Sequence, residues 1–401
     1  MSKKKRVLIL ENIHALARDL FIQAGFEVEQ VKTALNTEEL KTKLKDFDVL
    51  GIRSKTQITK EVIANAQHLE TIGCFCVGTN QVDLDAANSF GIPVFNAPFS
   101  NTRSVAEMVI GEIVMLSRQL GTRNNEMHRG TWNKKSDKCF EVRGKTVGIV
   151  GYGNIGSQVS YLAEGMGMRV VFYDINSKLP LGNAKPMPSL AELLAESDVV
   201  TFHVPETQFT HEMMGPEEMK AMKPGAFLIN ASRGKVVQIP SLISNLKSGH
   251  IGGAAIDVFP TEPEGNTDGF KVELQNLNNV ILTPHIGGAT EEAQGNIGRE
   301  VAALLISYLK DASTQMCVNF PKIDLTKDPK NHRIINIHKN VPGVLKDINR
   351  IISESGANIQ AQALSTDATI GYLIIDLDQP IQNKMISEIN GLKTSIRTRV
   401  I

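Results

Sequence analysis

The sequence is poor in cysteine and has no long apolar run. Its 401 residues contain four cysteines, Cys74, Cys76, Cys139 and Cys317, which are too few for a disulfide-stapled fold and are not spaced as zinc ligands. We therefore expect free thiols and no metal. No apolar stretch approaches the roughly 20 residues that a membrane span needs, and the apolar run at residues 7–10 is too short for a signal peptide. These absences predict a cytoplasmic protein without a membrane partner.

The chain has no excess of charge of either sign. Lysine and arginine together number 43, and so do aspartate and glutamate. Because a nucleic-acid-binding surface normally carries a basic excess, this balance argues against a nucleic-acid partner. At roughly 150 residues per domain, the length suggests two or three domains, and small-molecule chemistry becomes the default class of function.

Short β-branched segments alternate with amphipathic segments, a pattern typical of parallel βαβ units. One series fills about the first hundred residues, and a second, with six predicted strands, begins at Lys145. A long helix is expected between them, with Ser104 and Glu107 as its capping box, and another after residue 288. The last seventy residues or so follow the order βαββαβ, which is that of a ferredoxin-like unit.

We therefore predict an α/β protein with two doubly wound parallel-sheet domains and a small third domain. The predicted boundaries are 1–101 with 288–325 for a discontinuous, flavodoxin-like domain that binds the substrate, 102–287 for a Rossmann-like domain, and 330–401 for the ferredoxin-like domain. The segment 321–332 is polar and contains two prolines, so it is interpreted as a linker.

The segment GYGNIG follows a predicted strand and precedes a predicted helix. It places Gly151, Gly153 and Gly156 in the G-x-G-x-x-G register. In a dinucleotide-binding unit the first glycine permits a tight turn, the second lets the backbone approach a pyrophosphate, and the third lets helix and strand pack closely. The N-terminus of the helix offers unpaired N–H groups to the anion. This context predicts a dinucleotide site.

The next predicted strand, RVVFY, is followed by Asp174. A carboxylate at this position can hydrogen-bond the ribose hydroxyls of the adenosine. A 2′-phosphate there would meet a like charge, at a cost of roughly 1 kcal/mol in water and about 4 kcal/mol at an effective dielectric constant of 20. We therefore expect NAD rather than NADP. The alternative is that Asp174 only caps its strand.

Three further strand ends of the same sheet carry residues suited to alcohol oxidation, namely Arg233, Glu262 and His285. Hydride transfer from a secondary alcohol needs a group that takes the hydroxyl proton, and histidine suits this role because it titrates near neutrality. A carboxylate on its other nitrogen, for which Glu262 is the candidate, would hold the tautomer and raise the pKa. The planar guanidinium of Arg233 can orient the carboxylate of a 2-hydroxy acid.

The segments GYGNIG, NASRGKVV, AIDVFPTEP and TPHIGGAT, in this order, resemble the D-isomer-specific 2-hydroxyacid dehydrogenases over about residues 5–320. The resemblance implies that Arg233, Glu262 and His285 are the catalytic residues. It also implies cofactor contacts at Asn154, Ile155, Ala231, Ser232, Asp257, Gly287 and Gly288. His203 and Pro205 resemble residues on the adenine side of the cofactor, although simple packing is the alternative for His203.

The first hundred residues should bind the rest of the substrate. The candidates are Arg53, Ser54 and Asn101, with the backbone amides of Val77 and Gly78 as a carboxylate cradle. A cluster of cationic and polar groups favours a phosphorylated substrate over an apolar one. These loops resemble the branch of the family that oxidises 3-phosphoglycerate to 3-phosphohydroxypyruvate in serine synthesis, some members of which also reduce 2-oxoglutarate.

Two other functions stay open. Another branch of the family, such as a hydroxypyruvate or glyoxylate reductase, would be recognised by the lack of a phosphate-binding loop and of a C-terminal extension. An NAD-sensing corepressor is the second alternative, but it would not need the ferredoxin-like domain, and the balanced charge gives no nucleic-acid footprint.

The C-terminal domain resembles the ACT domain, a small ligand-binding module of enzymes in amino-acid metabolism. Its N-x-P-G element begins at Asn340. The resemblance implies a regulatory site for L-serine at His338, Asn340 and Asn358, shared between paired ACT domains. Val341 stands where arginine is common, so the strength of serine control stays open, and a dimerisation module without ligand is the alternative. The resemblance also implies that Trp132 contacts a neighbouring subunit of a homo-oligomer, expected to be a tetramer.

Overall fold

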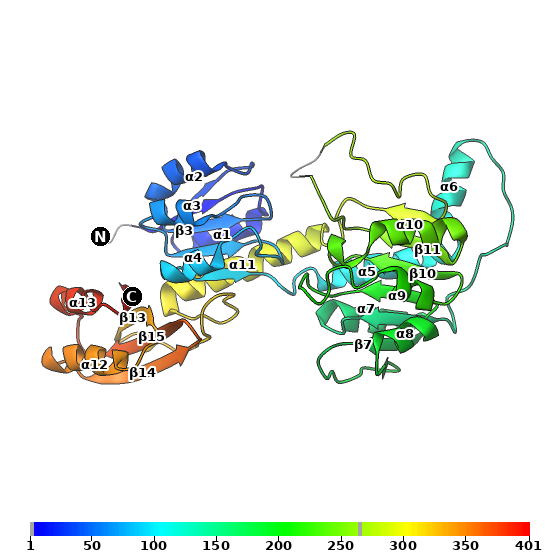
Figure 1. Ribbon diagram of the computed structural model, residues 1–401. Helices are drawn as coiled ribbons and strands as arrows, with labels where there is room; N and C mark the ends of the chain where they lie inside the picture. Colours follow the sequence, from blue (N-terminus) through cyan, green and yellow to red (C-terminus); the bar gives the residue numbers. More distant parts are fainter. Residues whose placement is uncertain (1–3, 264–266) are drawn as a thin grey trace. The chain divides into compact units, whose positions relative to one another are not determined.

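The computed structural model describes residues 4–263 and 267–401 (Figure 1). The chain divides into two compact units: Met1–Ser100 with Gln294–Ile401, here called unit 1, and Asn101–Ala293, here called unit 2. In this division the C-terminal domain shares unit 1 with the first hundred residues. The three domain boundaries expected from the sequence stay a prediction.

Unit 1 contains a parallel five-stranded sheet in the order β2-β1-β3-β4-β5. The strands are β1 (Arg6–Ile9), β2 (Glu27–Gln30), β3 (Val49–Ile52), β4 (Thr71–Cys74) and β5 (Val94–Asn96), and the helices between them are α1 (Ala15–Gln23), α2 (Thr37–Lys43), α3 (Lys60–Asn65) and α4 (Leu84–Ser89). Strands β3 and β4 are buried throughout, as is usual where helices cover both faces of a parallel sheet. The strand order is flavodoxin-like and confirms the predicted fold of this part.

The long helix α11 (Glu291–Asp311) packs on this sheet. Its side chains Val301, Leu305 and Tyr308 are fully buried in the shared core. Gly73 of β4 allows the close approach, because a Cβ there would lie 2.6 Å from Leu305 and 2.7 Å from Val301.

Unit 2 contains a parallel seven-stranded sheet in the order β12-β11-β10-β9-β6-β7-β8. The strands are β6 (Thr146–Val150), β7 (Arg169–Tyr173), β8 (Lys185–Pro186), β9 (Val199–Phe202), β10 (Ala226–Asn230), β11 (Ile251–Ile256) and β12 (Val280–Leu282). The helices are α5 (Thr102–Ser117), α6 (Leu120–His128), α7 (Asn154–Gly165), α8 (Leu190–Glu196), α9 (Pro216–Ala221) and α10 (Ile239–Ser248). This is the strand order of a Rossmann sheet with one added edge strand, and it confirms the predicted class.

Two details of unit 2 differ from the sequence prediction. The sheet has a seventh strand, β8, which escapes prediction because it is two exposed residues that include Pro186. Helix α5 begins at Thr102, so Ser104 lies inside the helix and the predicted capping box with Glu107 is wrong. The Ser104 hydroxyl instead bonds the Thr290 hydroxyl at 2.8 Å.

The C-terminal domain has the βαββαβ order that the sequence predicts. Its elements are β13 (His332–Lys339), α12 (Val344–Glu354), β14 (Ile359–Thr366), β15 (Ile370–Leu377), α13 (Asn383–Asn390) and β16 (Ser395–Val400), and its antiparallel sheet has the order β14-β15-β13-β16. One face of the sheet packs with Ile348 of α12 and Met385 of α13. The other face contributes Ile337 and Tyr372 to the core around α11.

A buried ion pair lies where the C-terminal domain meets the end of α11. The fully buried Arg333 binds both carboxylate oxygens of Asp376, at 2.6 and 2.7 Å. It also donates to the carbonyl oxygens of Asp311, at 2.5 Å, and Leu325, at 2.8 Å. The segment before β13 has no regular secondary structure, yet these bonds and the burial of Ile323 fix it to unit 1.

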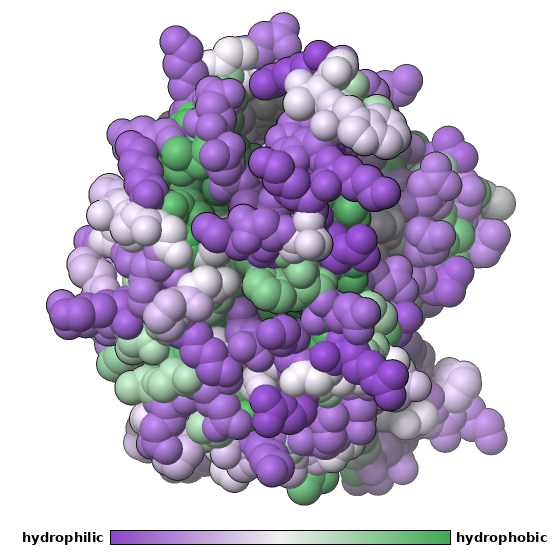
Figure 2. All heavy atoms as spheres, turned by 90° about the vertical axis from the view of Figure 1, so that its right-hand side faces the viewer, coloured by the Kyte–Doolittle hydropathy of each residue, from purple (hydrophilic) through white to green (hydrophobic). Residues whose placement is uncertain are grey.

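The molecular surface is mostly polar in the view of Figure 2, where hydrophilic side chains dominate and apolar groups form small separate patches. Among the large apolar side chains of unit 2, Trp132 is 78% exposed. No helix in the described part of the chain is long and apolar enough to cross a membrane.

Candidate active site

The loops that carry the predicted cofactor and catalytic residues lie at one edge of the unit 2 sheet. The glycine-rich loop follows β6, Asp174 follows β7, His203 follows β9, Arg233 follows β10 and His285 follows β12. Because the strands are parallel, their carboxyl ends share one edge, where doubly wound sheets bind ligands.

The three glycines of the GYGNIG loop differ in the space around their Cβ positions. Gly151 has a φ of +92°, and a Cβ there would lie 2.4 Å from a backbone oxygen of the loop after β9. A Cβ on Gly156 would lie 2.2 Å from the Gly151 carbonyl oxygen. By contrast, among the described residues a Cβ on Gly153 would meet no atom within 4 Å, and no side chain caps helix α7. This open space beside the N–H groups of Asn154 and Ile155 suits a pyrophosphate, so the residues present fit the cofactor.

Asp174 binds two backbone amides. Its carboxylate accepts hydrogen bonds from the N–H groups of Tyr152 and Asn176, both at 2.9 Å. Since Tyr152 belongs to the glycine-rich loop, Asp174 fixes that loop at the end of β7. Each carboxylate oxygen still has a lone pair for a ribose hydroxyl, so the capping role and the cofactor role are compatible.

His203 carries a buried nitrogen without a partner. Its Nε2 lies 3.1 Å from the Thr201 hydroxyl, while Nδ1 has no hydrogen-bond partner among the described residues. Burial lowers the pKa of His203 to about 3, so the ring is neutral. A buried polar atom left unpaired costs free energy, which favours a ligand contact over simple packing. The predicted Pro205 is exposed next to it.

The side chain of Asn230, at the end of β10, shapes the turn that presents Arg233. Its oxygen accepts from the N–H and the hydroxyl of Ser232, at 3.1 and 2.8 Å, and its nitrogen donates to the Arg233 carbonyl at 3.0 Å. Gly234 is required next, because a Cβ there would lie 2.0 Å from the Phe259 backbone. The Arg233 guanidinium donates to the Ser232 carbonyl at 2.7 Å. Ala231 completes the turn.

Asp257 organises the loop that carries His285. Its buried carboxylate accepts hydrogen bonds from the Thr283 hydroxyl at 2.6 Å, the Ile286 N–H at 2.8 Å and the Gly287 N–H at 2.9 Å. Its carbonyl oxygen accepts from the His285 N–H at 2.8 Å. These bonds hold His285 at a φ of +55°, a left-handed conformation that costs a non-glycine residue about 1 kcal/mol.

Glu262 and His285 form a hydrogen-bonded pair, with 2.7 Å between Oε2 and Nδ1. The bond with Glu262 raises the pKa of His285 despite partial burial. Burial raises the pKa of Glu262, but hydrogen bonds from His285 and from the Phe259 N–H outweigh it, so the net pKa is lowered. The charge of Arg233 makes a smaller contribution that lowers the pKa of both groups. With Nδ1 engaged, Nε2 of the half-exposed ring is available to a substrate.

A carboxyl group that the sequence did not suggest lies buried in the same unit. Glu112 of α5 is 4% exposed, and neither carboxyl oxygen has a hydrogen-bond partner among the described residues. Burial, with a smaller contribution from Asp257, raises the pKa of Glu112 to about 8. Glu112 is therefore mostly protonated at neutral pH, which spares Asp257 a second negative charge nearby.

Asn101, a predicted substrate residue, lies against the loop that follows His285. A Cβ on Gly288 would lie 2.7 Å from Asn101 Nδ2, so only glycine fits there without a shift. The Oδ1 atom of Asn101 is buried and has no hydrogen-bond partner in the part of the chain that the structure describes. The structure thus brings Asn101 next to a predicted cofactor residue.

The substrate residues predicted in unit 1 lie in two neighbouring loops, after β3 and β4. The buried Gln81 joins them, because its side-chain amide donates to the carbonyl oxygens of Arg53 and Gly78. Asn96 likewise binds the Val77 carbonyl at 2.5 Å. Within the described residues the N–H groups of Val77 and Gly78 make no hydrogen bond, so they are available to an anion.

The Arg53 loop is also fixed from its other side. Glu11 accepts hydrogen bonds from two backbone N–H groups of this loop, at 2.9 and 3.0 Å. Ser54 is exposed between these anchors. Arg53 lies near His14 and Gln294, around a gap too narrow to hold a water molecule.

The predicted effector residues Asn340 and Asn358 lie far apart in one chain. The Asn340 N–H bonds the Thr369 carbonyl at 3.0 Å, and the Asn358 N–H bonds Asp378 at 3.1 Å. Thr369 and Asp378 flank opposite ends of β15, whose 8 residues span about 25 Å at ~3.3 Å per residue. A single C-terminal domain cannot present both asparagines to one small ligand.

His338 is buried in β13. Its Nδ1 lies 3.1 Å from Asn336 Oδ1, and its ring occupies the space beside Gly371, where a Cβ would lie 2.2 Å from Nε2. Burial lowers the pKa of His338. His338 is 3% exposed in a single chain.

Several residues that shape these loops were not apparent from the sequence. They are Glu11, Gln81, Glu112, Asn230, Gly234 and Thr283. Asn230 gave a signal that could have been used, because an asparagine directly after an apolar strand often forms a turn. Gln81 and Glu112 gave none, since Arg53 and Asp257, the residues that give them their roles, are distant in sequence.

Comparison with known families gives two matches. The model of the D-isomer specific 2-hydroxyacid dehydrogenase, NAD binding domain, matches residues 110–287, and that of the AHAS small subunit-like ACT domain matches residues 334–397. The D-3-phosphoglycerate dehydrogenase of Dictyostelium discoideum is 52% identical over 99% of this chain and 97% of its own length. That of Escherichia coli K12 is 51% identical over 99% of this chain and 98% of its own length.

Solved structures agree on the fold. The D-lactate dehydrogenase from Aquifex aeolicus, complexed with NAD and lactic acid, has a TM-score of 0.69 at 28% identity and covers 79% of this chain and 100% of that one. The TT0316 protein from Thermus thermophilus has a TM-score of 0.69 at 33% identity, with 76% of this chain and 97% of its own covered. The chain is therefore an NAD-dependent oxidoreductase that belongs to the D-isomer specific 2-hydroxyacid dehydrogenase family, and it matches the D-3-phosphoglycerate dehydrogenases over nearly its whole length.

Proposed function

We propose that this enzyme oxidises 3-phospho-D-glycerate to 3-phosphohydroxypyruvate, the first committed step of L-serine synthesis. The observation that carries the proposal is the 2.7 Å hydrogen bond between Glu262 and His285 beside Arg233, at the sheet edge of the glycine-rich loop. The pair supplies an acid–base group and the arginine a carboxylate clamp, which together suit a 2-hydroxy acid. The full-length relatives named D-3-phosphoglycerate dehydrogenase support the choice of substrate.

The catalytic residues divide the work of oxidation. NAD, when bound, supplies the hydride acceptor. Arg233 binds the substrate carboxylate and stabilises charge on the forming carbonyl oxygen. His285 takes the hydroxyl proton on Nε2, and Glu262 stabilises the resulting imidazolium through Nδ1. In the reverse direction the same imidazolium returns the proton.

The cofactor-binding residues are assigned as part of the same proposal. Gly151, Gly153, Asn154, Ile155 and Gly156 hold the pyrophosphate, Asp174 the ribose, His203 and Pro205 the adenine side, and Ala231, Ser232, Asp257, Gly287 and Gly288 the nicotinamide side. The open space at the Gly153 Cβ position and the unpaired His203 Nδ1 support this assignment.

The substrate-binding residues are Arg53, Ser54, Val77, Gly78 and Asn101. Arg53 supplies a planar guanidinium for phosphate or carboxylate, and the backbone N–H groups of Val77 and Gly78 supply two more donors. The carbonyl oxygens of Val77 and Gly78 are held by the side chains of Asn96 and Gln81, which fixes the orientation of this loop. The unpaired Oδ1 of Asn101 supports a polar ligand contact there.

L-Serine is the proposed regulatory ligand, bound between the ACT domains of two chains. The separation of Asn340 and Asn358 within one chain supports a shared site, because a second copy can bring its Asn358 to the Asn340 end of the first. The alternative, a dimerisation module without ligand, would not require these asparagines.

A homo-oligomer, which we propose to be a tetramer, follows from the same proposal. Trp132 is 78% exposed, and burying so large an apolar side chain against a second copy would be favourable.

The test is NADH formation by the full-length protein with 3-phosphoglycerate, with D-lactate and D-glycerate as competing substrates, and with and without L-serine. The expected result is the highest kcat/KM for 3-phosphoglycerate and a lower rate with L-serine.

His285→Ala should lower kcat by a factor of roughly 10² to 10⁴. His211→Ala, at an exposed histidine of the same unit, should be without effect. Preference for D-lactate or D-glycerate, or near-normal turnover of His285→Ala, would refute the proposal. Consumption of NADH with 2-oxoglutarate or with glyoxylate tests whether those acids are also reduced.

A further inference from the structure

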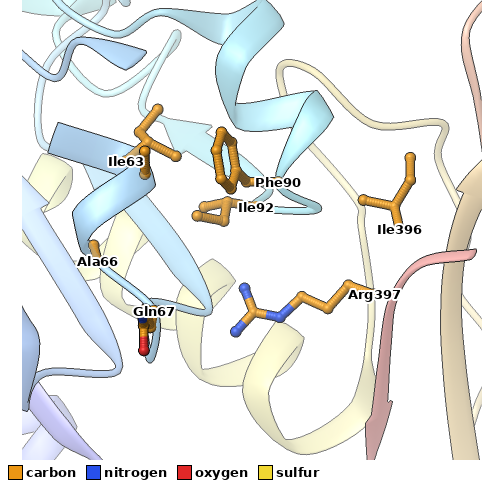
Figure 3. Close-up of a pocket in the computed structure, with 8 residues that line it drawn as sticks. Ile63, Ala66, Gln67, Phe90, Ile92, Ile396 and Arg397 are labelled. Carbon is orange, nitrogen blue, oxygen red and sulfur yellow. The ribbon is translucent and has the colours of Figure 1, made fainter. Parts of the chain in front are cut away.

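A cavity of about 260 Å³ lies in unit 1 where β16 of the C-terminal domain faces the ends of α3 and α4 (Figure 3). Its walls include Ile63, Gln67, Phe90, Ile92, Ile396 and Arg397. None of these residues belongs to the catalytic, cofactor, substrate or serine sites proposed above.

One of three arginines on this sheet face has no carboxylate at ion-pair distance among the described residues. Arg333 of β13 and Arg399 of β16 each have a carboxylate oxygen nearby, at 2.6 and 2.7 Å. Among the described residues Arg397 has no such partner, and its one hydrogen bond runs from Nη1 to the Leu69 carbonyl at 2.6 Å. Figure 3 shows its guanidinium reaching across the cavity toward Gln67. The remaining N–H donors of Arg397 therefore border the cavity.

The surroundings of Arg397 make an anionic partner favourable. Burial, with the like charge of Arg399, lowers the pKa of Arg397 from its ordinary value, although Tyr308 and the more distant carboxylates of Glu70 and Asp48 act in the opposite direction. Partial burial removes water from the guanidinium, and one hydrogen bond to a neutral carbonyl oxygen does not fully offset the free energy that this costs. An anion that enters the cavity would restore the balance and could use the planar fork bidentately.

The shape and lining narrow the class of ligand. The volume is large enough for several water molecules, which suits a small organic acid. A single cation favours a single negative charge. Six of the eight lining residues are apolar, and the other two are Gln67 and Arg397, which favours a ligand with both a polar head and a branched hydrocarbon body. Gly91 keeps β16 close, since it has a φ of +66° and a Cβ there would lie 2.9 Å from the Arg397 Cβ.

We propose that this cavity binds a small monocarboxylate with a branched apolar body. Its carboxylate lies on the Arg397 guanidinium and its body packs against Ile63, Phe90 and Ile92. Because α3 follows the loop that carries Arg53, such a ligand would brace the C-terminal domain against the element next to the substrate-binding loop.

Calorimetric titration of the full-length protein with 3-methylbutanoate tests the proposal. We expect saturable binding of one molecule per chain, with a Kd of about 1 mM or tighter. The neutral isostere 3-methylbutanamide should bind at least tenfold more weakly, because it lacks the charge. Arg397→Gln should weaken binding of the acid at least tenfold. Arg350→Gln, at an exposed arginine paired with Glu354 on α12, is the matched control and should leave binding unchanged.

A second variant keeps the test decisive if Arg397→Gln fails to fold. Ala64 lines the cavity from an exposed position of α3, so Ala64→Phe fills the cavity and leaves Arg397 in place. It should abolish binding without lowering the melting temperature. Absence of saturable binding by the unmodified protein, equal affinity for the amide, or acid binding that survives Ala64→Phe would each overturn the proposal.

Discussion

At the scale of single residues, His285 depends on two carboxylates with different tasks. Asp257 binds the backbone around His285 and holds its left-handed conformation. Glu262 binds the ring through Nδ1 and raises its pKa. Glu262 therefore makes the largest contribution to the proton affinity of His285, while Asp257 holds its position and adds a smaller electrostatic contribution to the same pKa.

Replacing Glu262 by glutamine should move the pH profile of oxidation. Oxidation needs a neutral imidazole, so kcat/KM rises with pH through the pKa of His285, which Glu262 holds above its ordinary value. In Glu262→Gln that pKa falls, so the acid limb should shift to lower pH, while kcat drops at least tenfold because the imidazolium loses its counter-charge. The measurement is NADH formation as a function of pH.

Glu262→Asp keeps the negative charge, so the acid limb of its pH profile should lie closer to that of the unmodified protein than the limb of Glu262→Gln does. Identical limbs in all three proteins would show that the Glu262 charge does not set the pKa of His285.

Glu112 makes a separable prediction about stability. Its pKa is raised to about 8 in the folded protein, against an ordinary value near 4.5. Between these values the folded form keeps a proton that the unfolded form has lost, so this group lowers the free energy of unfolding as pH rises, by at most about 1.4 kcal/mol per pH unit. Glu112→Gln cannot titrate, so its stability relative to the unmodified protein should increase steadily from pH 5 to pH 8.

Urea unfolding across that pH range provides the measurement. Glu107→Gln is the matched control, since Glu107 lies on the same helix but is exposed and pairs with Arg103. Its curve should run parallel to that of the unmodified protein. A parallel curve for Glu112→Gln as well would mean that Glu112 is ionised in the fold.

At the scale of elements, Gln81 joins the two loops of the proposed anion cradle in unit 1. Gln81→Leu removes the donors and leaves the carbonyls of Arg53 and Gly78 without this partner, at about 1–2 kcal/mol. If the cradle binds substrate and transition state alike, KM for 3-phosphoglycerate should rise about tenfold with little change in kcat.

Steady-state kinetics with both substrates check this prediction. KM for NAD should not change, because the glycine-rich loop lies in unit 2. Gln57→Leu is the control, as Gln57 is exposed and only bonds the Lys55 carbonyl at 3.3 Å. Equal increases in both KM values would indicate general misfolding instead of a local effect.

The elements themselves were predictable where local pattern dictates structure. Buried strands such as β3 and β10 are continuous apolar runs, and the glycine-rich loop joins a strand to a helix as the spacing requires. The edge strand β8 could not be found, because Pro186 and Lys185 give no β pattern and its pairing depends on β7. The start of α5 was misplaced, since Ser104 is as suitable a cap residue by type as Asn101.

The candidate site was predictable as a set of residues but not as a set of bonds. Sequence spacing placed Arg233, Glu262 and His285 at neighbouring strand ends. It could not show that Asp257 binds the backbone of the His285 loop or that Glu112 lies buried without a partner among the described residues, because both depend on packing between distant segments.

At the scale of the whole molecule, the C-terminal domain is built into unit 1 by two kinds of contact. Ile337 and Tyr372 join the apolar core around α11, and the Tyr372 hydroxyl donates to the Ala312 carbonyl at 2.8 Å. Arg333 links Asp376 to the last carbonyl of α11. The ACT domain is therefore in direct contact with α11, a helix that begins shortly after the His285 loop in sequence.

The Arg333–Asp376 pair should show strong coupling in a double-mutant cycle. Arg333→Met or Asp376→Leu alone leaves one charge buried without its partner, at a cost of about 3–5 kcal/mol in the free energy of unfolding. The double variant leaves neither charge, so it should be more stable than the sum of the single costs predicts by at least about 2 kcal/mol. It should not recover fully, because the Arg333 bonds to Asp311 and Leu325 are also lost. Urea unfolding measures all four proteins. Additive costs would mean that the two side chains stabilise the domain independently, and that the ion pair does not anchor it to α11.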